Sequence, residues 1–337
     1  MTVLIIADPF IPVPPSGYGG TERIAYYLGQ QLQRNGHKVH LMAGEGSRPF
    51  NGRLVVHAPP TLSRPSRIFR KIYFQWLCWL HFRRVDIVIN YARVDYLFAF
   101  RSMNKRLICI FQNPVSPYED NWLAESPRVV PVGISRSHVG NLRTTSRFRV
   151  ISNSVDLSRY NFRAQPGKYL AFLGRLTYNK GVDIAINVAR HTGMPLKIAG
   201  NISTEGGQTE FYEKSVKPFV GGLIEYVGEL DDSMKNEFLG NALATLFPIR
   251  WDEPFGIVMI ESMACGTPVI ALNRGSVSEV ITNGVDGYVC NDVPEMIHAV
   301  QSADKISRAR CRQTVEERFT APVMAREVEK IFSELMS

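Results

Sequence analysis

A short segment in the second half of the chain, FLGRLTYNKG (172–181), places two cations after an apolar run. Arg175 and Lys180 stand five positions apart, and both could reach one bound diphosphate. The planar guanidinium would hold two phosphate oxygens at once, and the lysine ammonium would add a compact positive charge. Two ordinary cations on a solvated loop are the alternative, and this segment alone leaves that alternative open.

A second segment, EPFGIVMIE, places Glu253 and Glu261 eight positions apart. Pro254 and Gly256 favour a loop that turns into a helix over about residues 257–266. Three backbone amides would then lie at the positive end of this helix, where an anion can bind: those of Phe255, Gly256 and Ile257. Glu253 could accept hydrogen bonds from hydroxyls before the helix, and Glu261 from a second hydroxylated ring further along. A phosphate between two polyols, as in a nucleotide sugar, would account for both acids, although such a spacing is common in proteins.

The first half contains a glycine-rich loop, PPSGYGGTER (14–23), between a strand pattern and a helix pattern. Backbone N–H groups and the helix dipole could hold an anion there. The loop lacks the Gly-Lys-Ser/Thr of a phosphate-binding Walker loop, and Glu22 stands where a dinucleotide fingerprint needs its last glycine. A tight turn without a ligand is therefore an equal alternative, and an NAD-dependent oxidoreductase is a weaker one.

Length and composition limit the classes of protein to consider. A chain of 337 residues favours two domains of about 150 residues each. The formal net charge of +8 suits an anionic partner. Five cysteines without a CxxC pair argue against a disulfide framework or a zinc site and favour a reducing compartment. The N-terminus lacks the basic start of a signal peptide, and no uncharged apolar run reaches the roughly 18 residues of a membrane span, so we expect a cytoplasmic chain.

Short apolar runs alternate with helical patterns, which is typical of parallel βαβ units. Thr21 is the expected N-cap of the first helix. Strands of the first half are predicted at 3–7, 39–43, 86–90, 107–111 and 129–133. After the polar segment 153–168 the pattern restarts, with strands predicted at 169–174, 195–200, 224–228, 244–248, 267–272 and 287–290. We therefore expect two doubly wound α/β domains joined near residue 160, with the ligand at the carboxyl ends of the strands and in the cleft between the domains.

Several motifs in a fixed order resemble glycosyltransferase family 4, whose members are retaining enzymes with the GT-B fold of two facing Rossmann-like domains. The segments that carry the resemblance are GGTERIAYYLGQQLQRNGHKVHLM (19–42), VISNSVDLSRY (150–160), FLGRLTYNKGVDIAI (172–186), YVGEL (226–230), ALATLFPIRWDEPFGIVMIESMACGTPVIAL (242–272) and GSVSEVITNGVDGYVC (275–290). The resemblance covers nearly the whole chain. It implies an N-terminal acceptor-side domain over 1–155, to which a C-terminal helix at 321–337 packs back, and a nucleotide-sugar-binding domain over 165–320.

The resemblance also implies roles for single residues. Arg175 and Lys180 would bind the donor diphosphate, while Glu253 would hold the transferred sugar. Glu261 would reach the nucleotide ribose. Three amides are expected at the sugar and the phosphates: those of Phe255, Gly256 and Ile257. The other donor-side candidates come from the first loop and from YVGEL: Gly19, Gly20, Val227 and Gly228. The acceptor-side candidates are Tyr18, Glu22 and Gln112.

The implied reaction transfers a glycosyl group from a nucleoside diphosphate sugar to a hydroxyl of a saccharide or lipid-linked acceptor, with retention of configuration. Synthesis of an envelope polysaccharide, a lipopolysaccharide or a glycolipid is the expected setting. No cofactor and no metal is implied, and the chain has no Asp-x-Asp pattern. Gln112 stands where many family members carry histidine, and glutamine cannot shuttle a proton at neutral pH. Ser154 stands where the family usually has glycine.

Other functions remain open on this sequence. The alternatives are a sugar-nucleotide hydrolase or epimerase of the same fold and a non-catalytic nucleotide-sugar-binding subunit. A glycosidase-type pairing of Glu253 with Glu261 is disfavoured because the second acid is predicted within a helix, away from the sugar.

The stretch RPSRIFRKIYFQWLCWLHFRR (64–84) is basic at both ends and rich in aromatic residues. As a helix it has one apolar stripe, through Ile68, Ile72, Trp76 and Trp79. This stripe could pack on the sheet of its own domain, or it could enter an anionic membrane surface flanked by the basic residues. The aromatic residues could equally line an acceptor pocket. Nucleic acid is not an expected partner, because no recognition module is visible.

Overall fold

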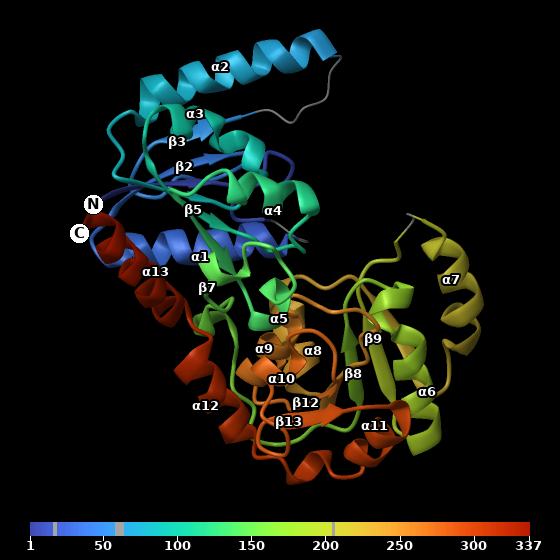
Figure 1. Cartoon of the computed structure of the whole chain (residues 1–337). Helices are drawn as coiled ribbons and strands as arrows, with labels where there is room; N and C mark the ends of the chain where they lie inside the picture. The colour runs from blue at the N-terminus through green and yellow to red at the C-terminus, as the bar shows by residue number, and fades with distance from the viewer. Residues whose placement is uncertain (16–18, 58–63, 204–205) are drawn as a thin grey trace. The chain divides into compact units, whose positions relative to one another are not determined.

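The structure, a computed structural model, describes residues 1–15, 19–57, 64–203 and 206–337 (Figure 1). The chain forms two compact units. The first contains Met1–Asn153 and Ala321–Ser337, and the second contains Ser154–Thr320. The two ends of the second unit pair with each other: Val155 N–H donates to the Phe319 carbonyl at 2.9 Å, and Val155 forms a parallel bridge with Thr320.

The first unit is built on a parallel sheet with the strand order β3-β2-β1-β4-β5-β6-β7. Its strands are β1 Thr2–Ile6, β2 Lys38–Ala43, β3 Leu54–Val56, β4 Ile87–Asn90, β5 Arg106–Ile110, β6 Val129–Gly133 and β7 Arg149–Val150. The sequence predicts five of them. It misses β3 and β7, which are two or three residues long at the sheet edges and are not buried, so they lack an apolar run.

Helices cover both faces of this sheet. They are α1 Gly20–Arg34, α2 Arg64–Phe82, α3 Phe98–Ser102, α4 Pro117–Ala124, α5 Arg136–Val139 and α13 Ala321–Met336, with 3-10 turns η1 Val94–Leu97 and η2 Thr145–Arg147. In Figure 1, α1 and α13 lie together on one face, and α2 lies with α3 on the other. The expected cap at Thr21 is wrong: α1 already begins at Gly20, and Gly19 occupies the N-cap without a capping side chain.

The C-terminal helix α13 is part of the first unit. Glu329 of this helix accepts hydrogen bonds from the Asn35 side chain at 2.8 Å and lies 2.9 Å from Nε2 of His37. Near the end of the helix, the Leu335 carbonyl accepts a hydrogen bond from Arg106. These contacts join the last turns of the chain to the first unit's sheet and to α1.

The second unit is also built on a parallel sheet, in the order β10-β9-β8-β11-β12-β13. Its strands are β8 Leu170–Leu173, β9 Leu196–Ala199, β10 Ile224–Gly228, β11 Ala244–Phe247, β12 Val269–Leu272 and β13 Gly287–Cys290. The sequence predicts all of these, because most of them are buried apolar runs of four or five residues. The predicted fold class of two doubly wound, Rossmann-like sheets is confirmed.

Seven helices surround this second sheet within the described residues: α6 Val182–Thr192, α7 Gln208–Ser215, α8 Asp232–Gly240, α9 Ile257–Ala264, α10 Val277–Val280, α11 Val293–Val300 and α12 Arg308–Arg318. Four 3-10 turns accompany them: η3 Leu157–Arg159, η4 Tyr178–Lys180, η5 Lys217–Phe219 and η6 Ala303–Lys305. Figure 1 shows α6 beside α11 and α9 beside α12. The helix predicted over about 257–266 is α9, which ends two residues earlier.

No described helix is both long enough and apolar enough to cross a bilayer. The described residues also contain no group of three or more histidine, cysteine, aspartate or glutamate side chains placed to hold a metal ion. All five cysteines are free and buried.

Candidate donor site in the second unit

The strand order of the second unit reverses between β8 and β11, which pair directly although β9 and β10 lie between them in the chain. Ala244 of β11 lies opposite Leu170 of β8. At such a switch point the loops leaving neighbouring strands diverge, and ligands of doubly wound sheets bind there. The loop after β8 is 174–181 and the loop after β11 is 248–256. The topology therefore brings together the two segments that the sequence singles out.

An arginine clamp joins these two loops. The Arg250 guanidinium donates to both carboxylate oxygens of Asp183, at 2.7 and 2.6 Å, and to the Tyr178 carbonyl at 2.8 Å. It also lies 4.2 Å from the centre of the Tyr178 ring. The Arg250 N–H donates to the Asn179 carbonyl at 2.9 Å. The hydrogen bonds to Asp183 are the main cause that raises the pKa of Arg250. The clamp fixes the η4 turn, which carries Lys180, to the segment that carries Glu253.

Lys180 and Glu253 form an ion pair across the two loops. Both side chains are largely buried, with 20% and 14% exposed. The ammonium also lies 5.5 Å from the centre of the Trp251 ring. The indole Nε1 of Trp251 is buried and has no hydrogen-bond partner among the described residues. A buried donor without an acceptor is costly, so a bound ligand with an acceptor oxygen would satisfy it.

Arg175 differs from Lys180 in its surroundings. It is half-buried on the loop after β8, and its guanidinium has no hydrogen bond or ion pair within the part of the chain that the structure describes. Its backbone carbonyl accepts from the Thr177 N–H at 2.9 Å, which holds the loop in a tight turn. A half-buried guanidinium without a protein anion is available to a phosphate.

The N-terminus of α9 is left open towards this loop region by a glycine. Gly256 occupies the N-cap with φ 74°, and no side chain of the described chain caps the helix. A Cβ at this position would lie 2.8 Å from the Phe247 ring, so glycine is required by space as well as by conformation. The amides at the helix start therefore keep the partial positive charge that the sequence predicts for Phe255, Gly256 and Ile257.

A second loop supports the segment before α9. Ser276 donates through its hydroxyl to the Phe255 carbonyl at 2.8 Å and through its N–H to the Glu253 carbonyl at 3.1 Å. Gly275 adopts φ 57°, and a Cβ there would lie 2.4 Å from the backbone nitrogen and oxygen of Glu253. The loop at 275–276 thus supports the backbone of Glu253, and no pattern in the sequence indicates this support.

Glu261 has partners of its own. It lies within α9 and is buried, with 5% exposed. Its Oε1 accepts a hydrogen bond from the Tyr160 hydroxyl at 2.9 Å and lies 3.6 Å from the Lys235 ammonium. Both contacts use the same oxygen, which leaves Oε2 for a ligand. The two motif glutamates therefore have separate partners, which fits separate roles better than one shared proton.

Val227 and Gly228 lie at the carboxyl end of β10, on the same edge of the sheet as the loop after β8. Gly228 has φ 82°, and a Cβ there would meet nothing within 4 Å, so the space beside it is open. Its carbonyl accepts from the Gly200 N–H at 2.9 Å. This places the pair where a base could lie, and that role stays a prediction.

The remaining predicted residues belong to the first unit. Gly19 and Gly20 form the start of α1, and their role at a donor phosphate stays a prediction. Tyr18 lies outside the described residues. Glu22 is buried, and burial raises the pKa of its carboxyl, with nearby Asp8 raising it further.

Gln112 follows β5 and forms a reciprocal amide pair with Asn153, with both N···O distances at 2.8 Å. Both polar atoms of the Gln112 side chain are therefore engaged within the first unit. The sequence did not predict this pair, because the two residues are 41 positions apart.

Comparison with protein families matches each half of the chain to a different model. Residues 18–159 match the model described as Glycosyltransferase Family 4, and residues 157–317 match that described as Glycosyl transferases group 1. The two matches meet at the boundary between the two structural units.

Several known proteins are similar to this chain, over different parts of its length. Glycogen synthase of Mycobacterium tuberculosis is 33% identical over 186 residues, which covers 51% of this chain and 44% of that relative. The chain thus spans less than half the length of this relative. The crystal structure of AviGT4, a glycosyltransferase involved in Avilamycin A biosynthesis, has a TM-score of 0.74 at 23% identity and covers 99% of this chain and 97% of that one. Anabaena Alr3699/HepE in complex with UDP-glucose has a TM-score of 0.78 at 14% identity, with 99% and 100% covered. Both halves of the chain thus match glycosyltransferase family models, together over residues 18–317, and its fold is shared with glycosyltransferase structures.

Proposed function

We propose that this protein transfers a sugar from a nucleoside diphosphate sugar to an acceptor hydroxyl, with retention of the anomeric configuration and without a metal ion. The observation that carries the proposal is the convergence of Arg175, Lys180, Glu253 and the uncapped start of α9 at the switch point of the second unit. Positive charge gathers there from two side chains and a helix terminus. A departing diphosphate needs that charge.

Donor binding would separate the Lys180–Glu253 ion pair. In the described structure the two groups neutralise each other. A donor phosphate would compete with Glu253 for the ammonium, and the released carboxylate would accept hydrogen bonds from the sugar hydroxyls. One binding event would thereby place both groups: lysine on the leaving group and glutamate on the transferred ring. Arg175 needs no such exchange, because no described protein anion holds it.

Glu261 would bind the two ribose hydroxyls of the nucleotide. Its Oε1 is fixed by Tyr160 and Lys235, so the carboxylate is oriented before the ligand arrives. The buried Trp251 N–H would find its acceptor on the donor, in a phosphate or sugar oxygen.

The chemical step would place both reactants on the same face of the sugar. The acceptor oxygen forms the new bond to the anomeric carbon as the bond from that carbon to the phosphate oxygen breaks. The acceptor proton passes to the departing phosphate oxygen, so the products are the glycoside and the nucleoside diphosphate. Arg175, Lys180 and the α9 amides stabilise the negative charge that develops on the diphosphate. Gln112 needs no proton-transfer role in this scheme, which is consistent with its engagement by Asn153.

The acceptor is a saccharide or a lipid-linked saccharide, in polysaccharide, lipopolysaccharide or glycolipid synthesis. The glycosyltransferase nature of the relatives supports a sugar acceptor, and the UDP-glucose bound to Alr3699/HepE supports a nucleotide sugar as donor. The nucleotide and the sugar are open to direct measurement.

A screen of UDP-, GDP- and ADP-sugars by thermal shift tests the donor. At a hundredfold excess over the dissociation constant, a true donor should stabilise the second unit by about 2.7 kcal/mol. The selected donor is then incubated with candidate saccharide acceptors, and nucleotide release and product configuration are measured. Acceptor-dependent release of nucleoside diphosphate with a retained linkage supports the proposal. Free sugar released at the same rate without acceptor would favour a hydrolase instead, and binding without turnover would favour a non-catalytic subunit.

A further inference from the structure

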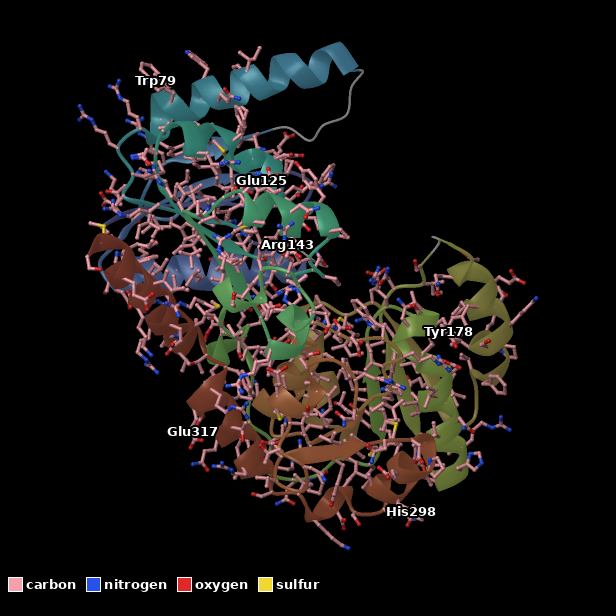
Figure 2. All side chains as sticks on the ribbon, viewed as in Figure 1. Trp79, Glu125, Arg143, Tyr178, His298 and Glu317 are labelled. Carbon is pink, nitrogen blue, oxygen red and sulfur yellow. The ribbon has the colours of Figure 1, made fainter. Side chains whose placement is uncertain are left out.

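Helix α2 of the first unit has apolar residues on two opposite faces. On its inner face Cys78 and Phe82 are fully buried, and Phe74 packs against the same core. On the opposite side five large apolar residues are exposed, here called the outer face: Ile72 (61%), Tyr73 (53%), Trp76 (52%), Trp79 (52%) and Leu80 (42%). Figure 2 shows Trp79 at the outer end of this unit, on α2.

This arrangement argues against one of the three interpretations of the apolar stripe, which is packing on the sheet of its own unit. Ile72, Trp76 and Trp79 do not pack on the sheet of their own unit. A different stripe of the same helix does that. A surface helix normally carries polar residues away from the core. Five large apolar side chains on adjacent turns form a continuous patch, which marks an interaction site rather than scattered exposure.

The patch is organised and bordered by positive charge. The Tyr73 and Trp76 rings stack at 5.9 Å with an angle of 29°. The Arg83 guanidinium lies 5.2 Å from the centre of the Trp79 ring. Arg83 and Arg84 are exposed just beyond the helix end. Residues 64–84 contain six lysine or arginine residues and no aspartate or glutamate.

We propose that the outer face of α2 docks on an anionic lipid bilayer, with the helix lying in the plane of the interface. Tryptophan and tyrosine favour the boundary between headgroups and acyl chains. The basic residues would meet the anionic headgroups that such a helix requires. A second copy of the chain is a poorer occupant, because a two-fold contact would set two stretches of unbalanced positive charge against each other. The proposal goes beyond glycosyl transfer: it concerns where the protein lies and does not depend on which reaction it performs.

The test uses the full chain and vesicles of phosphatidylcholine with about 30% phosphatidylglycerol, against vesicles of phosphatidylcholine alone. Two of the four tryptophans lie on the outer face, so their emission should shift to the blue on binding. Lipids brominated at a shallow acyl position should quench that emission. The double variant Trp76→Ser/Trp79→Ser should bind anionic vesicles at least tenfold more weakly in co-sedimentation. Phe219→Ser, which changes an exposed aromatic residue of the second unit, should bind like wild type.

Charge is tested separately with Arg83→Glu/Arg84→Glu, which changes two exposed residues outside the helix. This variant should lose binding to anionic vesicles, and raised salt should weaken wild-type binding. Unfolding midpoints of all variants are compared, and brominated-lipid quenching of the wild type needs no variant at all.

Three results would overturn the proposal. One is the absence of wild-type binding and quenching, and another is undiminished binding by the Trp76→Ser/Trp79→Ser variant. The third is a concentration-dependent dimer that this variant abolishes, without vesicle binding by wild type, which would assign the face to a second copy. None of these results depends on a donor, so failure here and failure of the proposed reaction can be told apart.

Discussion

Replacement of Lys180 by alanine is the sharpest test of the donor site. In the structure its ammonium is paired with Glu253, and in the proposed complex it moves to the donor diphosphate. One charge-assisted hydrogen bond is worth about 1.5–3 kcal/mol, which corresponds to roughly 10- to 150-fold in kcat/KM. The variant also leaves Glu253 unpaired beside an incoming anion, and this repulsion acts in the same direction. We therefore expect a loss towards the upper end of that range.

The assay measures nucleoside diphosphate release at low donor concentration, which reports kcat/KM. Lys168→Ala is the matched control, because Lys168 is exposed and precedes β8, at the opposite edge of the sheet. It should stay within twofold of wild type. Glu253→Gln and the double variant with Lys180→Ala complete a cycle. If Lys180 served only to hold Glu253, the double variant would match Glu253→Gln. A Lys180→Ala enzyme within threefold of wild type would refute the assignment of its ammonium to the phosphate.

Three further perturbations follow from the geometry. Gly275→Ala would force a Cβ to 2.4 Å from the backbone of Glu253, so activity should fall at least tenfold and the unfolding midpoint should drop. Gly284→Ala is the control: Gly284 also has a positive φ, but a Cβ there would meet nothing within 4 Å, so activity should be largely spared. A double-mutant cycle of Arg250→Lys and Asp183→Asn, followed by denaturant unfolding, should give a coupling of about 0.5–3 kcal/mol, and strict additivity would contradict the clamp. Burial raises the folded-state pKa of Glu22, so its ionised form costs stability at neutral pH. Glu22→Gln should therefore raise the unfolding midpoint at pH 7, by about 2–4 °C for each kcal/mol gained, and the gain should vanish below the unfolded-state pKa of about 4.3.

The buried strands were predictable because each is a short apolar run between turn residues. Most of the second unit's strands follow that pattern, and so do the five buried strands of the first. The edge strands β3 and β7 escape prediction because pairing with a neighbour, rather than burial, makes them strands. The predicted start of α1 is wrong for a different reason. Thr21 is a good capping residue, but the backbone of Gly19 already occupies the cap position.

In the candidate donor site, the sequence indicates which residues are present, but it does not indicate which of them contact each other. Glu253 and Lys180 are 73 positions apart, so only the direct pairing of β8 with β11 makes them neighbours. The same topology brings Arg250, in the loop after β11, to Asp183, in the first turn of α6. Opposite charges shortly after two adjacent strands were the available signal. The bond between Tyr160 and Glu261 spans 101 positions and follows no local pattern. Such contacts depend on which strands are adjacent, and periodicity carries no information about that.

The paired ends of the second unit have a consequence for how such chains can be recombined. Because Val155 and Thr320 form a bridge, the chain enters and leaves the second unit at neighbouring positions. It is a cassette with both of its boundaries side by side. Two cuts there would excise it whole, and a short linker could rejoin the remaining ends. An exchange of this unit between relatives would carry the loops after β8 and β11 together, so under the proposed function donor preference would move with it.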